Sequence, residues 1–312
     1  MKDFFSVFDT LLFQNTLRTA TPVILAALGC LLTDQVGMMN IGVEGMMLIG
    51  AFFAVWGSFL FGSWAAGLAF ALGVGLLLGL MYYLLVIRFK ADEFVIGVAL
   101  NIFAGGLTVF LLRTVFGPGV KGSFADPRIQ PLPGLDWPLL ESLPVIGPLL
   151  SGNTLLVYVS WLLVLLCWAL LYKTPLGYHL RTAGEHPEAL RTAGKSPERM
   201  KCLASILCGM LSTLAGAHLS LGYLTMFSEN MSDSRGFVAV ACVIFGASNP
   251  PKVFLAALLF GFLDALGLRL QRYVSSYLTA MVPYVVTVLM MVLVVLYRRR
   301  KARPRVTQAV KG

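Results

Sequence analysis

The chain has 312 residues, of which 58% are hydrophobic and only 12% are charged, and its formal net charge is +9. Soluble domains carry about 25% charged residues, so this composition excludes an ordinary soluble protein and predicts one all-α polytopic membrane domain over residues 1–312. Six lysines and arginines lie in residues 173–201, and seven lie in residues 298–312. More than half of the 24 basic residues thus lie in two short segments. This concentration indicates membrane orientation, and no nucleic-acid partner is expected.

Seven apolar runs are long enough to cross a bilayer as helices. Two shorter runs, at residues 237–248 and 253–268, are separated by Asn249-Pro250-Pro251-Lys252. They fit either a re-entrant hairpin buried in protein or two short spans, so we expect about 8–9 transmembrane segments in all. The seven longer runs lie at residues 17–32, 38–61, 64–87, 94–115, 153–172, 201–223 and 279–297.

The orientation of these spans follows from the charges of the loops between them. Loop 173–200 and the tail 298–312 are basic, so both are expected in the cytosol, and the tail can also contact anionic membrane lipid. Loop 116–152 is long, near neutral and rich in proline and glycine, so it is expected outside. Alternation then places the N-terminus outside. The sequence thus predicts a multi-pass protein of the plasma (inner) membrane with a cytosolic C-terminus.

Polar residues and glycines begin the second apolar run. Asn40 and Glu44 are four residues apart, which would place them on one face of a helix that Gly42 and Gly45 weaken. One interpretation is a broken helix that lines a cavity; the other is that Glu44 lies near the interface and is merely capped. Asn101, in the middle of a span, either lines a path or bonds across helices.

The most polar interruption of the apolar sequence is the stretch from Gly184 to Gly194. Pro187 can open a helix and Gly194 can close one, so a helix of about two turns, near 10 Å long, is expected between them. It is too short to cross a bilayer. Ser196-Pro197 predicts the start of the next helix. The short helix would present a small apolar face formed by Ala189, Leu190 and Ala193.

Two further patterns concern packing and chemistry. Gly75 and Gly79 form a GxxxG motif, which predicts close helix packing.

The chain has no HExxH, GxSxG or Walker A motif, so it cannot hydrolyse ATP with a P-loop of its own. Its five cysteines form no CxxC pair and it has only three histidines, so we expect it to bind no metal and no cofactor.

Three blocks of sequence resemble one family. They are NIGVEGMMLIGA at residues 40–51, GEHPEALRTAG at residues 184–194 continuing to CGMLSTLAG at 208–216, and GFVAVA at 236–241 with GASNP at 246–250. Together they resemble the inner-membrane permease subunits of ABC importers, in the branch that handles nucleosides, simple sugars and branched-chain amino acids. The first block looks most like the nucleoside or simple-sugar permeases.

This resemblance implies a second homologous permease, two cytosolic ATPase domains that bind ATP and Mg²⁺, and an external substrate-binding protein. It implies that the short polar helix expected between Pro187 and Gly194, called the stub below, couples the permease to the ATPase. Leu190 departs from the family, which often has alanine there, and should alter the fit in the ATPase groove. The coupling residues would be Gly184, Glu185, His186, Pro187, Glu188, Ala189, Leu190, Arg191 and Gly194.

The candidates for lining the substrate path are Asn40, Glu44 and Asn101, chosen for their polarity. A branched-chain amino-acid permease of the same family is one alternative function. A stand-alone secondary transporter is another, but it predicts inverted repeats and a midplane ion site, and no convincing repeat is seen. A membrane-embedded enzyme would need a paired nucleophile and base, which the sequence lacks. We therefore predict a transport subunit and not an enzyme.

Overall fold

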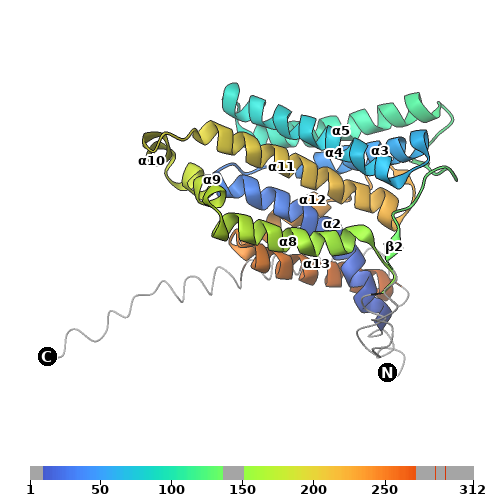
Figure 1. Cartoon of the computed structure of the whole chain (residues 1–312). Coiled ribbons are helices and arrows are strands. Elements are labelled where there is room, and N and C mark those ends of the chain that lie inside the picture. Colours follow the sequence, from blue (N-terminus) through green and yellow to red (C-terminus); the bar gives the residue numbers. More distant parts are fainter. Residues whose placement is uncertain (1–9, 136–150, 272–284, 286–291, 293–312) are drawn as a thin grey trace.

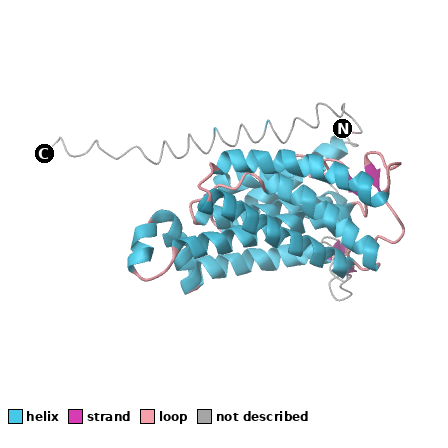
Figure 2. Cartoon of the chain, turned by 90° about the horizontal axis from the view of Figure 1, so that it is seen from above, coloured by secondary structure: helices cyan, strands magenta, loops and turns pink. Residues whose placement is uncertain are grey.

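The computed structural model describes residues 10–135 and 151–271, together with the single residues 285 and 292. Within these ranges the chain is a bundle of roughly parallel helices (Figures 1 and 2). Seven of the described helices are long and apolar enough to cross a membrane. The predicted all-α polytopic class is therefore confirmed. The predicted span at 279–297, the tail 298–312 and residues 136–150 of the predicted external loop lie outside the described residues.

The long helices follow one another along the chain, with short connections from α2 to α5 and longer ones after α5, α8 and α11. Two of them, α4 and α11, continue into the π-helical turns η1 (Leu84–Arg88) and η2 (His218–Tyr223). The long helices are α2 (Thr10–Gln35), α3 (Val43–Phe61), α4 (Trp64–Tyr83), α5 (Glu93–Phe116), α8 (Leu155–Lys173), α11 (Pro197–Ala217) and α13 (Pro250–Leu270).

Short elements occupy the two ends of the bundle. The helices α9 (Pro175–Glu185) and α10 (Pro187–Thr192) lie at one end, on the left of Figure 1. At the other end β1 (Ser123–Phe124) pairs antiparallel with β4 (Phe227–Ser228). There β2 (Gly134–Leu135) also pairs antiparallel with β3 (Asn153–Thr154).

The core is built around α2, α3 and α11. Most of their side chains are buried, whereas α4, α5, α8 and α13 leave most of their apolar side chains exposed, as helices that face lipid do. The GxxxG motif makes the predicted close contact, because a Cβ on Gly79 would lie 2.4 Å from the Ser205 carbonyl oxygen on α11. On Gly75 it would lie 2.2 Å from Thr213 Oγ1.

One predicted helix begins later than its apolar run. The run starts at residue 38, but α3 begins at Val43, because Gly37 adopts a left-handed φ of 71° and the Asn40 side chain bonds the backbone locally. The prediction that Asn40 and Glu44 share one helical face is therefore wrong. The chain instead breaks between α2 and α3, over residues 36–42.

The two short runs at 237–248 and 253–268 also differ from both expected arrangements. The first forms α12 (Arg235–Gly246), which at 1.5 Å per residue is about 18 Å long, too short to cross a bilayer. The second forms α13, which has 21 residues and is long enough to cross alone. Ala247 and Ser248, both in the left-handed region, end α12 and turn the chain into α13.

Candidate functional site

The helix α10 has the beginning and the end that the sequence predicts. Pro187 is at its first turn, and Gly194 follows it with a left-handed φ of 74°. The Gly194 N–H donates to the Arg191 carbonyl at 2.9 Å, and the Lys195 N–H donates to the Leu190 carbonyl at 3.1 Å. These two bonds form a Schellman motif, which satisfies the last carbonyls of the helix. Backbone hydrogen bonds therefore end the stub α10 at Gly194.

The side chains of this region divide into outward and inward groups. Glu185, His186, Glu188 and Ala189 are exposed, whereas Leu190 is only 2% exposed. The expected apolar face is therefore wrong, since Leu190 points into this chain while Ala189 and Ala193 point out. The expectation that Leu190 alters the fit in an ATPase groove loses its basis, because a buried leucine anchors α10 to the bundle.

Arg191 ties α10 to the first turn of α11. Its guanidinium contacts Glu188 at 2.9 Å and Glu198 at 2.5 Å. The hydrogen bond to Glu198 raises the pKa of Arg191 above its usual range. Ser196 caps α11, as predicted, by accepting from the Arg199 N–H at 3.3 Å. Exposed ion pairs contribute about 0–1 kcal/mol each, so this network orients α10 more than it stabilises the fold.

Gly184 joins the stub to the end of α2. A Cβ at this position would lie 2.4 Å from the Gln35 carbonyl oxygen and 2.9 Å from the Gly37 nitrogen. Gln35 in turn donates to the Ser248 carbonyl at 2.9 Å, and Ser248 donates to the Asp34 carboxylate. Backbone contact therefore links the α10 end of the molecule to the helix break, and side-chain hydrogen bonds link the break to the turn after α12.

The two amide candidates hold the broken segment in place. Asn101 Oδ1 accepts from the Gly45 N–H at 2.8 Å, and Asn101 Nδ2 donates to the Ile41 carbonyl at 3.1 Å. Asn40 Oδ1 accepts from the Gly42 N–H at 2.9 Å. Irregular backbone at membrane depth needs such partners, because no water is present in the hydrocarbon to supply them. Of the two alternatives for Asn101, the structure provides the bonds across helices.

The side chain of Glu44, on α3, contacts the start of α12, which is distant in the sequence. Its buried carboxylate accepts from the Ser234 N–H at 2.9 Å and from the Gly236 N–H at 2.6 Å. A negative charge at a helix N-terminus is favourable, since the first N–H groups have no partner within the helix. Glu44 therefore caps a second helix. Sequence spacing could not reveal this partner, although Gly236 stands in the third family-like block.

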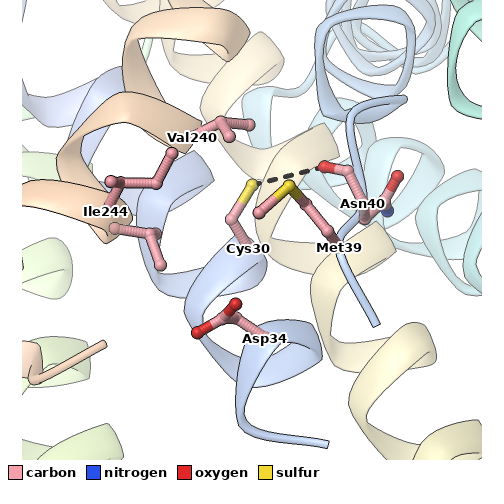
Figure 3. Close-up of a pocket in the computed structure, with 7 residues that line it drawn as sticks. Cys30, Asp34, Met39, Asn40, Val240 and Ile244 are labelled. Atoms are coloured by element: carbon pink, nitrogen blue, oxygen red, sulfur yellow. Dashed lines mark hydrogen bonds between the residues drawn. The ribbon is translucent and has the colours of Figure 1, made fainter. Parts of the chain in front are cut away.

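A small pocket opens beside the break, between α2 and α12 (Figure 3). Figure 3 shows Asn40 and Met39 on one side and Val240 and Ile244 on the other. Of the three predicted path residues only Asn40 lines this pocket. Glu44 and Asn101 lie near the break but are engaged in backbone bonds. The lining residues are Cys30, Asp34, Met39, Asn40, Val240, Val243 and Ile244.

Metal chemistry finds no support in the part of the chain that the structure describes. Within residues 10–135 and 151–271, no group of three or more histidine, cysteine, aspartate or glutamate side chains is placed to hold an ion. The site therefore consists of an exposed stub, a helix break and a half-length helix, arranged around hydrogen bonds and close backbone contacts.

Comparison with known proteins places this arrangement in a family. A family model described as "Branched-chain amino acid transport system / permease component" matches residues 12–295. The chain is 32% identical to the guanosine ABC transporter permease NupQ of Bacillus subtilis over 90% of both chains. It is 31% identical to the nucleoside permease NupC of Lactococcus lactis, over 91% of this chain and 92% of that one.

A third relative is the putative glucose ABC transporter permease TsgC13 of Haloferax volcanii, 34% identical over 83% of this chain and 78% of that one. No solved structure matches the chain. The family model alone spans far more than half of the sequence, and the described helices include seven candidate membrane spans. The chain therefore belongs to the family of branched-chain amino acid transport system permease components, as a multi-pass transport subunit and not an enzyme.

Proposed function

We propose that this chain forms the membrane path of an ATP-driven importer for nucleosides or related simple sugars. The observation that carries the solute class is the likeness, over most of the chain, to permeases named for guanosine, nucleosides and glucose. A nucleoside is neutral and offers a flat base and ribose hydroxyls, so apolar walls with a few hydrogen-bonding groups suit it. The low charged fraction of the chain agrees with such a solute.

The stub α10 is the point at which we propose that a cytosolic ATPase acts. It projects from one end of the bundle and exposes Glu185, His186, Glu188 and Ala189 (Figure 1). The stub is attached firmly to the bundle by its buried Leu190, by an ion pair to α11 and by the contact of Gly184 with α2. It should therefore move together with these helices. Movement imposed on α10 would thus reach α11 and the helix break together. Two ATPase domains carrying ATP and Mg²⁺ would supply that movement.

The remaining partners follow from the same proposal. A second homologous permease would complete the path, as the likeness to permeases of ABC transporters suggests. An external substrate-binding protein would deliver the solute at the end that carries the β-strands. The end that carries α10 would face the cytosol, as would the C-terminus. Lys173, Arg191 and Lys195 at the α10 end agree with this orientation.

The family description favours one alternative solute, a branched-chain amino acid. Its zwitterion would require charged or helix-terminal partners at the path. Glu44 does not serve that purpose here, because its carboxylate already binds two backbone N–H groups. Family membership also argues against a stand-alone secondary transporter, which would need no ATPase.

Uptake measurements test the proposal directly. Radiolabelled guanosine, ribose and leucine would be supplied to cells with and without this chain, with the other transporter components intact. We expect loss of guanosine or ribose uptake and unchanged leucine uptake. Loss of leucine uptake alone would replace the proposal by the amino-acid alternative. Uptake that persists without the ATPase partner would remove the coupling role of α10.

A further inference from the structure

The turn that leads into α12 carries an exposed carboxylate, Asp233, within the depth of the membrane. The turn after α12 binds Asp34 and Gln35 at the α10 end of the bundle, and Asp233 lies beyond the opposite end of α12, about 18 Å away at 1.5 Å per residue. Arg235 pairs at 3.3 Å with Asp264, which is about 21 Å along α13. Both estimates place Asp233 well inside a hydrocarbon layer about 30 Å thick.

A third helix agrees with this depth. Glu44 binds the N–H groups on both sides of Arg235, and its neighbour Gly45 is bonded to Asn101. Asn101 is about 12 Å along α5 from its α10 end, at 1.5 Å per residue. The start of α12 is thus fixed against α3, α5 and α13 at an internal level of the bundle.

Asp233 is exposed at this level, and its charged neighbours are already engaged. Arg235 is paired with Asp264, and Glu44 accepts from two backbone N–H groups. Among the described residues no ion pair to Asp233 is found. A carboxylate turned toward hydrocarbon at such depth is strongly disfavoured, so ionisable groups there face a cavity or a partner.

The surface beside Asp233 is apolar and partly aromatic. Phe237 and Ile244 are each 46% exposed, and Val240 lies between them on the same helical face. Val240 and Ile244 also line the pocket with Met39 and Asn40 (Figure 3). One strip therefore leads from an exposed carboxylate, past an exposed ring, to a pocket near the α10 end.

We propose that this strip, from Asp233 along α12 to Ile244, lines the solute path, with Asp233 and Phe237 as the solute contacts near the middle of the membrane. The inference rests on the proposed function and assigns its specificity residues. Asp233 accepts hydrogen bonds from ribose hydroxyls or from N–H groups of a base, and Phe237 packs against the flat face of the solute. Glu44 and Asn101 then act as positioning residues that hold the start of α12, because their polar atoms are bonded to backbone.

Thiol labelling tests whether the strip faces water, whatever the solute. Asp233→Cys and Phe237→Cys would be expressed with the other transporter components, and membranes would be treated with a charged methanethiosulfonate reagent. The matched control is Leu165→Cys, because Leu165 is 63% exposed on the apolar face of α8. We expect labelling of the first two variants above the parent chain and none of the control. Labelling of Asp233→Cys and Phe237→Cys no greater than that of Leu165→Cys would overturn the proposal.

Uptake kinetics test the contact itself. Asp233→Asn keeps the shape of the side chain but loses the charge-assisted bond, so KM for guanosine should rise about tenfold at unchanged protein level. Asp126→Asn is the control, because Asp126 is a carboxylate in the loop at the strand end, paired with Arg128. An unchanged KM in Asp233→Asn, or a fall in the amount of assembled permease pair, would show that Asp233 serves another contact. If the parent chain takes up no nucleoside, the proposed function fails while the labelling result still stands.

Discussion

At the scale of single residues, the polar groups in the middle of the bundle are bonded to backbone. Asn40, Glu44 and Asn101 each receive or supply bonds at chain breaks, where the helical pattern leaves N–H and carbonyl groups without partners. In hydrocarbon such groups cannot turn to water. These side chains therefore make possible the break before α3 and a start of α12 inside the bundle.

Glu44 gives the sharpest stability prediction at this scale. Glu44→Ala would leave the buried N–H groups of Ser234 and Gly236 without acceptors, at a cost of about 1–3 kcal/mol each. We expect a clearly lower Tm in detergent, measured by the temperature dependence of monodisperse elution. Glu185→Ala, which removes an exposed carboxylate, should leave Tm unchanged. Equal Tm values for the two variants would show that Glu44 does not support α12.

Only part of this residue pattern could be predicted from the sequence. Glycines and polar residues over 37–45 predict a weak helix start, since they are costly within a membrane helix. The partners of Glu44 could not be predicted, because Ser234 and Gly236 lie far along the chain. Asp233 was missed for a related reason. Its membrane depth follows from the length of α12 and the pairing of Arg235 with Asp264, which a hydropathy pattern does not contain.

At the scale of elements, glycines set how closely the helices approach. Gly75 and Gly79 let α4 lie against α11, and Gly184 lets the end of α9 touch the end of α2. Apolar runs predicted most spans well, because each helix must satisfy its own backbone in lipid. The short run at 237–248 predicted the length of α12, but not the turn that ends it, since Ala247 and Ser248 reach their left-handed conformations where Asp34 and Gln35 hold the chain.

The GxxxG contact predicts a pair of outcomes on one helix. In Gly79→Val the new side chain would meet the Ser205 carbonyl, forcing α4 away from α11. We expect a several-fold loss of folded protein in the membrane, seen as less monodisperse protein on size exclusion. Gly73→Val is the matched control on α4, because a Cβ there meets nothing within 4 Å. Similar yields for both variants would contradict the close packing.

The contact of Gly184 with α2 predicts a functional change. Gly184→Val would push α9 from the Gln35 carbonyl, so movement of α10 should no longer reach the helix break. We expect solute uptake to fall several-fold while the assembled transporter still hydrolyses ATP. Gly106→Val adds the same side chain where a Cβ meets nothing and should keep normal uptake. Normal uptake in Gly184→Val would remove this route of coupling.

At the scale of the whole molecule, the bundle has two chemically different ends. The α10 end carries Arg88, Lys90, Lys173 and Lys195, whereas the strand end carries the paired loop charges Asp126 and Arg128. Such asymmetry sets the orientation of membrane helices, because short basic loops stay in the cytosol. The order of the spans could be predicted from the sequence, but the burial of α2, α3 and α11 at the centre could not, because all the spans are apolar.

Orientation predicts which end an impermeant reagent can reach. Lys121→Cys, near the exposed β1 end, should react with a charged thiol reagent on intact spheroplasts. Lys195→Cys, exposed beyond α10, should react only after the membrane is opened, because the proposed orientation puts the α10 end in the cytosol. The parent chain sets the background, since four of its cysteines are buried and Cys202 is half-buried. With the predicted span at 279–297, the same orientation predicts that a reporter fused after Gly312 reads cytosolic. Reaction of Lys195→Cys on sealed spheroplasts would reverse the proposed orientation. It would place α10 outside the cell, where no cytosolic ATPase could reach it.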